Sequence, residues 1–133
     1  MREEVTGWLE RARKAIRAAR VLRDNGFPED AVSRAYYAMF YCAKALTVRQ
    51  GQALTKHRAV ISAFGRDFAR TGALNPKLHM YIREAFEQRG IADYTWNAEM
   101  RDKVATDHIN RAQEFVRAVE EYLQAHPDEK PSE

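Results

Sequence analysis

Arg89, Asp93 and Tyr94 belong to the segment whose residue types suggest chemistry most strongly. Arg89 follows Ala85 by four residues and Ile82 by seven, so it continues the apolar face of a predicted helix. A guanidinium on such a face needs an anion, because an unpaired buried charge is strongly destabilising. Asp93 could supply it in an internal ion pair, which the spacing alone favours. Alternatively, Arg89 binds a phosphate bidentately, while Asp93 orients it and Tyr94 adds a hydroxyl.

Arg34 raises the same question, because it lies in the most apolar stretch of the chain with Tyr37 and Tyr41 on its own helical stripe. It could pair with Asp93 or with another acid in the core. It could instead point with Arg89 into a shared polar cleft. Two arginines that converge from different helices would favour phosphate binding. The sequence leaves these alternatives open.

Lys56 and His57 begin another predicted helix, where side chains and backbone N–H groups together could hold an anion. A solvated helix start is the simpler expectation for this pair. His108 lies on the apolar stripe of the last predicted helix and is expected to be a hydrogen-bonded core histidine. The histidines lack the spacing and the partners of a zinc site, so we predict neither a metal site nor a cofactor.

The elements that must position these residues are all helical. Apolar residues recur every three or four positions over 5–22, 60–68, 78–86 and 104–122, which is typical of amphipathic helices. The segment 28–48 is apolar nearly all round, so its helix must be central or must also line a subunit contact. Thr55, Asn75 and Asn97 are predicted N-terminal caps. Five helices with short connections predict an all-α, up-and-down bundle over residues 1–125, followed by a frayed tail over 126–133.

The composition limits the possible partners. With 22 basic and 19 acidic residues, the net charge is +3 over 133 residues, which only mildly indicates a polyanionic partner. The apolar run 35–43 is too short to span a bilayer, and no apolar leader is visible at the N-terminus. The single cysteine, Cys42, lies in that run and should be an inert packed thiol. We therefore expect a cytoplasmic protein that has no membrane partner.

Four segments together resemble one family. They are 31–46, which contains Ser-Arg-Ala-Tyr-Tyr; Lys56-His57 with Val60 and Phe64; 89–94, which fits Arg-x-x-Ala-Asp-Tyr; and 112–116. In these segments the chain resembles the HEPN domains, in particular their small stand-alone prokaryotic branch, from about Gly7 to Leu123. The resemblance implies an up-and-down helical bundle that usually forms a homodimer. It also implies a small nucleotidyltransferase as a partner, frequently within a toxin–antitoxin pair.

Many HEPN domains are ribonucleases that need no metal, and the resemblance implies that Arg89 would hold the scissile phosphate. In those enzymes a histidine follows the arginine after four to six residues, but Tyr94, Thr95 and Trp96 occupy these positions here. Asp93 comes one residue too early, and an ordinary carboxylate is poorly matched to proton transfer near neutral pH. In some toxin relatives a tyrosine after that histidine is nucleotidylated, and Tyr94 is its nearest analogue.

These observations support three hypotheses about function. The first is a nucleotide- or RNA-binding module that acts with a nucleotidyltransferase. Its predicted site residues are Arg89, Asp93, Tyr94, Arg34, Tyr37, Lys56 and His57. The second is a metal-independent ribonuclease toxin with a degenerate active site, for which Arg89 and Asp93 are the best catalytic candidates. The third is a structural homodimer or adaptor.

Overall fold

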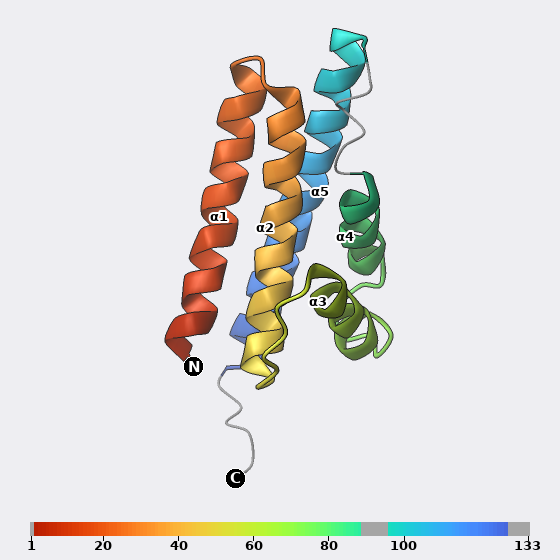
Figure 1. Ribbon diagram of the computed structural model, residues 1–133. Helices are drawn as coiled ribbons and strands as arrows, with labels where there is room; N and C mark the ends of the chain where they lie inside the picture. The colour runs from red at the N-terminus through yellow and green to blue at the C-terminus, as the bar shows by residue number, and fades with distance from the viewer. Residues whose placement is uncertain (1, 89–95, 128–133) are drawn as a thin grey trace.

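The computed structural model describes residues 2–88 and 96–127, and its elements are helical. These residues form five α-helices: α1 (Arg2–Asp24), α2 (Pro28–Arg49), α3 (His57–Phe64), α4 (Lys77–Gln88) and α5 (Ala98–Ala125). A π-helical turn, η1 (Gly65–Ala69), continues α3. Figure 1 shows that α1, α2, α4 and α5 alternate in direction, with the short α3 beside the lower part of α2. The predicted all-α, up-and-down architecture is confirmed.

The helix α2 is central, as its composition predicts. It packs against α1, α3, α4 and α5 and is buried on nearly all sides. Ala31, Ala35 and Ala38 are fully buried, and their small side chains let neighbouring helices approach closely. Tyr36 and Met39 are also fully buried and supply much of the core volume on this helix. The other helices of the chain therefore cover most of the apolar surface of α2.

Two of the three predicted caps are confirmed. The side chains of Asn75 and Asn97 accept hydrogen bonds of 3.0 and 3.1 Å from backbone N–H groups at the starts of α4 and α5. The prediction for α3 is wrong. Its backbone is still extended at Lys56, so the helix begins at His57, and Thr55 lies one residue too early to cap it.

Cys42 and His108 are titratable side chains that lie in the core. Burial raises the pKa of the Cys42 thiol far above its usual range, which agrees with the predicted inert thiol. His108 is buried as predicted, but its Nδ1 has no hydrogen-bond partner among the described residues. The prediction that this histidine is hydrogen-bonded is therefore wrong for Nδ1. Burial and the nearby Arg111 lower the pKa of His108 and favour its neutral form.

Replacing His108 with leucine is expected to raise Tm and to weaken its dependence on pH. The lowered pKa of His108 means that the unfolded chain takes up a proton there at a higher pH than the folded chain. This residue therefore costs stability as the pH falls below about 6.5. Leucine removes that cost together with the unpaired Nδ1.

Circular dichroism melts at about pH 8 and about pH 5 measure the effect of this change. His126→Leu is the control, because His126 is exposed. The same fall in Tm on acidification in His108→Leu and in the wild type would contradict the prediction.

Candidate nucleic-acid interface

Arg34 and Tyr37 lie about one turn apart on α2 and contact each other. The Arg34 guanidinium carbon is 4.7 Å from the centre of the Tyr37 ring, in a cation–π arrangement. Both side chains are half-buried. Within residues 2–88 and 96–127 no carboxylate pairs with Arg34, so a core acid of these ranges does not neutralise it. Its pairing with Asp93, which lies outside the described residues, stays a prediction.

Arg34 also lines a pocket of about 320 Å³ between α1 and α2. Arg11 and Lys14 of α1 line the same pocket, together with Tyr41. Arg11 donates a hydrogen bond of 3.0 Å to the Tyr41 hydroxyl and lies 4.4 Å from the centre of that ring. Arg34 is thus a cation at the surface of the bundle, beside two further basic side chains.

His57 is the first residue of α3, and its ring packs among the aromatic side chains of α2. Its Nδ1 lies 2.6 Å from the Tyr36 hydroxyl, and the two groups share a hydrogen bond. The ring stacks on Phe40 with centroids 4.1 Å apart, and it meets Tyr37 edge-on at 5.8 Å. We expected both residues at the start of this helix to be exposed to solvent. Lys56 is exposed, as expected, but His57 is half-buried, so the expectation is wrong for His57.

Three of the predicted site residues thus come together from two helices, and we call them the Arg34–Tyr37–His57 cluster. Phe86 of α4 extends this cluster, because its ring centre lies 6.1 Å from that of His57. The cluster combines a guanidinium with rings that are only partly covered by the fold. Such a surface suits a ligand that carries both negative charge and flat bases.

Arg89, Asp93 and Tyr94, which were also predicted for the site, lie outside the described residues. In the sequence Arg89 follows Phe86 by three residues. The convergence of Arg89 with Arg34 and the alternative ion pair with Asp93 are therefore both still predictions.

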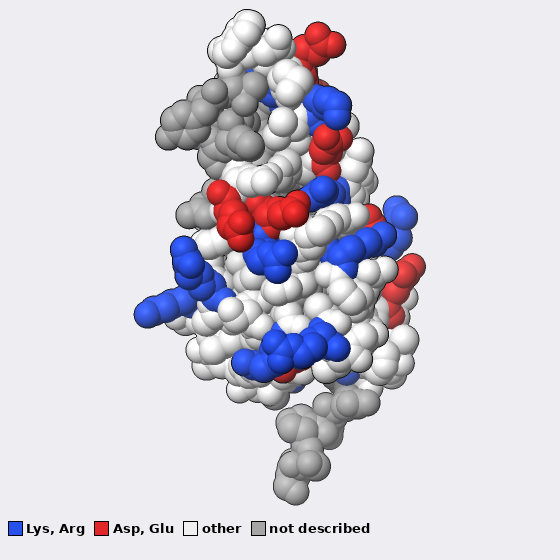
Figure 2. All heavy atoms as spheres, turned by 90° about the vertical axis from the view of Figure 1, so that its right-hand side faces the viewer, with Lys and Arg blue, Asp and Glu red and all other residues white. Residues whose placement is uncertain are grey.

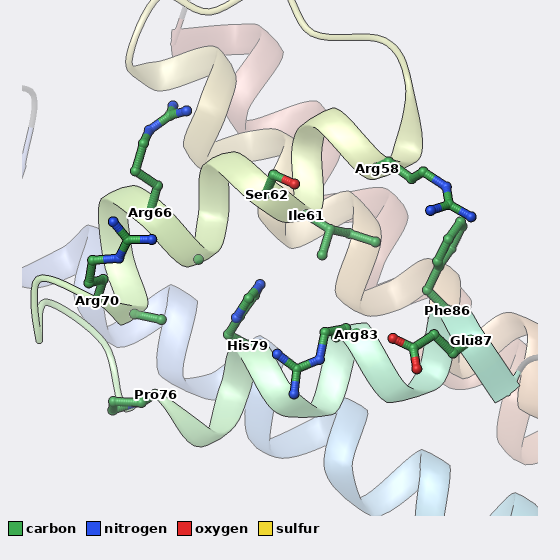
Figure 3. Close-up of a pocket in the computed structure, with 12 residues that line it drawn as sticks. Arg58, Ile61, Ser62, Arg66, Arg70, Pro76, His79, Arg83, Phe86 and Glu87 are labelled. Atoms are coloured by element: carbon green, nitrogen blue, oxygen red, sulfur yellow. The ribbon is translucent and has the colours of Figure 1, made fainter.

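A groove of about 750 Å³ lies between α3–η1 on one side and α4 on the other (Figure 3). Four arginines line it, and we call it the arginine groove: Arg58, Arg66, Arg70 and Arg83. Among the described residues of its lining, Glu87 is the one carboxylate. Figure 2 shows basic side chains spread over the lower part of this face of the molecule, where α3 and α4 lie. The groove is therefore an electropositive surface.

The four arginines differ in how the fold holds them. Arg66 donates two hydrogen bonds to Asp67, of 2.9 and 3.0 Å, and these lower the pKa of that carboxyl. The guanidinium carbon of Arg58 lies 5.6 Å from the centre of the Phe86 ring. The other two, Arg70 and Arg83, are exposed and have no carboxylate partner among the described residues.

His79 and Gly65 form the middle of the groove. A Cβ on Gly65 would lie 2.5 Å from Nε2 of His79, so this position admits no side chain while the ring is in place. Burial, with Arg83 nearby, lowers the pKa of His79 and favours its neutral form, while a hydrogen bond with the backbone of Ile61 acts in the opposite direction. Guanidinium groups beside a neutral imidazole suit the oxygens of a phosphate.

Sequence analysis did not identify this groove. One signal was available, because Arg66 and Arg70 are four residues apart and therefore lie on nearby faces of a helical segment. Nothing in the sequence shows that this face lies opposite Arg83, since the packing of η1 against α4 decides it. Within the described ranges, no group of three or more His, Cys, Asp or Glu side chains could hold a metal ion. None of the described helices is long and apolar enough to cross a membrane.

Comparison with known proteins gives a consistent result. The family model of the HEPN domain matches residues 5–122. A "UPF0332 protein" of Thermotoga maritima is 35% identical over 117 residues, which cover 88% of this chain and 89% of that protein. "Putative toxin MJ0142" of Methanocaldococcus jannaschii is 34% identical over 122 residues, which cover 92% of this chain and 83% of that protein. "Putative toxin MJ0605" of the same organism is 34% identical over 123 residues, 92% of this chain and 91% of that protein.

Proposed function

Because this chain belongs to the HEPN domain family, we propose that it is the toxin-like member of a toxin–antitoxin pair and that it acts by binding RNA. The names of two relatives support the toxin-like role. The proposed RNA site is the Arg34–Tyr37–His57 cluster. Lys56, which is exposed next to His57, contributes a further positive charge at its edge.

One observation carries this proposal: Arg34, with no carboxylate partner among the described residues, lies over a half-buried tyrosine that in turn contacts His57. Arginine recognises phosphate oxygens bidentately. Aromatic rings bind the flat faces of unpaired bases, with about 1–3 kcal/mol for each stacked base. Single-stranded RNA offers both groups at once, so it fits the cluster better than a simple anion does.

The segment after α4 completes the proposed site. We assign a phosphate contact to Arg89 and an orienting role to Asp93. Tyr94 is a candidate for modification by a partner nucleotidyltransferase. Support for these roles comes from the resemblance of 89–94 to the family motif and from the closeness of Phe86 to His57. The same resemblance supports a homodimer, a cytoplasmic location and a nucleotidyltransferase as the other member of the pair.

Fluorescence anisotropy with a labelled single-stranded RNA of about 12 nucleotides tests this function. The wild-type protein, with EDTA present, is expected to bind the RNA, and the affinity is expected to fall about tenfold or more between about 50 and about 200 mM salt. The reason is that about three or four phosphate contacts release a corresponding number of counterions. No binding at the lower salt concentration, or an affinity that does not depend on salt, would show that the proposed function is wrong.

A metal-independent ribonuclease is the second candidate, and the hydrogen bond between Tyr36 and His57 favours it. For His57 to act as a general base, its Nδ1 must donate this hydrogen bond to the Tyr36 hydroxyl, which fixes the ring and leaves Nε2 to accept a proton. His57 could then replace the histidine that is missing after Arg89. RNA that stays at full length during a long incubation with the protein in EDTA would rule out this candidate and leave the binding function intact.

A further inference from the structure

The arginine groove carries more positive charge than its own carboxylates neutralise. Its lining includes four arginines and one glutamate, and Asp67 forms an ion pair with Arg66. All four cations are arginines, the residue whose planar fork matches phosphate geometry.

The groove also has the shape of a binding site rather than of a flat charged surface. Figure 3 shows Arg70 and Arg83 on either side of His79, while Arg66 points away from the gap between the two walls. The ring of His79 can approach the η1 backbone this closely because Gly65 has no side chain. The volume of about 750 Å³ lies within the range of small-molecule sites.

One end of the groove adjoins the Arg34–Tyr37–His57 cluster through Phe86. The Phe86 ring contacts His57 on the cluster side and Arg58 on the groove side, at 6.1 and 5.6 Å. From Phe86 back to His79 the helix α4 extends for roughly 10 Å, which leaves room for more than one phosphate. The aromatic rings at this end favour a single strand, because the bases of a duplex are not exposed for stacking.

We propose that the arginine groove binds the phosphates of the single RNA strand whose bases lie on the Arg34–Tyr37–His57 cluster. Arg58 contacts the backbone where the strand passes Phe86, and Arg83 and Arg70 hold the phosphates that follow. His79 lies between these two arginines, and a hydrogen bond from its ring to a phosphate oxygen can only be one that the ring N–H donates. This inference rests on the RNA-binding function proposed above and adds a second site to it.

The test compares the double variant Arg70→Gln/Arg83→Gln with the matched double variant Arg17→Gln/Arg20→Gln. Both remove two positive charges, but Arg17 and Arg20 lie on α1, which packs against α2 and α5. Affinities are measured by anisotropy for single-stranded RNAs of about 4 and about 12 nucleotides. The groove variant should bind the long RNA about tenfold more weakly, with a salt slope smaller by about one, and the short RNA as the wild type does. The α1 variant should bind both RNAs within about twofold of the wild type.

Unchanged affinity of the groove variant for the long RNA would overturn the inference, and the proposed function would stand. Equal weakening by the α1 variant would also overturn it, because net charge alone would then explain the effect. If the groove variant lost affinity equally for the short and the long RNA, the RNA would occupy one site instead of two, which would also overturn the inference. Failure of the wild type to bind either RNA would instead remove the proposed function itself. A thermal melt checks folding, and Tm should not change, because Arg70 and Arg83 are exposed.

Discussion

Phe64→Ala is expected to lower the free energy of unfolding by about 3–5 kcal/mol, the largest effect predicted for a single residue of this chain. Phe64 is 0% exposed at the end of α3. Its ring centre lies 5.0 Å from that of Phe115 on α5 and 5.9 Å from that of Phe68 in η1. Alanine would leave a cavity between α3–η1 and α5, and the surrounding helices could close it only in part.

Thermal and urea melts followed by circular dichroism measure this loss, which corresponds to a fall in Tm of roughly 10–20 °C. Phe27→Ala is the matched control, because the same atoms are removed from a side chain that is 51% exposed. Its unfolding free energy should change by no more than about 1 kcal/mol. Similar losses in the two variants would contradict the packing that we describe around α3.

Gly65→Ala is the second substitution with a large expected effect, and here two opposing effects decide the sign. Gly65 has ordinary helical dihedral angles, φ −61° and ψ −46°, where alanine usually stabilises by about 0.5–1 kcal/mol. The new Cβ would lie 2.5 Å from Nε2 and 2.6 Å from Cε1 of His79. The ring would have to move and would lose its packing on η1. We therefore expect a net loss of about 1–3 kcal/mol.

The background variant His79→Ala separates these two effects. With the ring removed, the Cβ of Ala at position 65 has no clash with His79, and Gly65→Ala should then stabilise the protein by about 0.5–1 kcal/mol. Urea unfolding of the four proteins in this cycle gives the coupling energy between the two positions. The same loss from Gly65→Ala in both backgrounds would mean that His79 does not pack on Gly65.

The architecture could be predicted because each helix carries its own local signals. The spacing of apolar residues identified the helices, and the composition of 28–48 predicted a helix that is central or also lines a subunit contact. The central position is what the structure shows for α2. Asn75 and Asn97 were correct as caps because a side-chain cap depends only on the next few residues. Thr55 failed because the chain remains extended for one residue longer, at Lys56.

The candidate site could be predicted only in part, because helical spacing says which residues share a face and not what that face meets. Arg34 and Tyr37 were identified from their place on one helix, but the aromatic packing of His57 depends on how α3 lies against α2. The arginine groove was missed for a further reason. The π-helical turn η1 departs from the spacing of 3.6 residues per turn just where Arg66 and Arg70 occur.

The central claim is that RNA binds at the Arg34–Tyr37–His57 cluster, and the ratio of two dissociation constants tests it most directly. The two proteins are Arg34→Gln and its matched control Arg17→Gln, both measured against the same single-stranded RNA at about 100 mM salt. Each loses one positive charge, but only Arg34 belongs to the cluster. The account predicts that Arg34→Gln binds about tenfold or more weakly than the control, since it loses a charge-assisted contact and the cation beside Tyr37. Equal dissociation constants for the two variants would contradict the account.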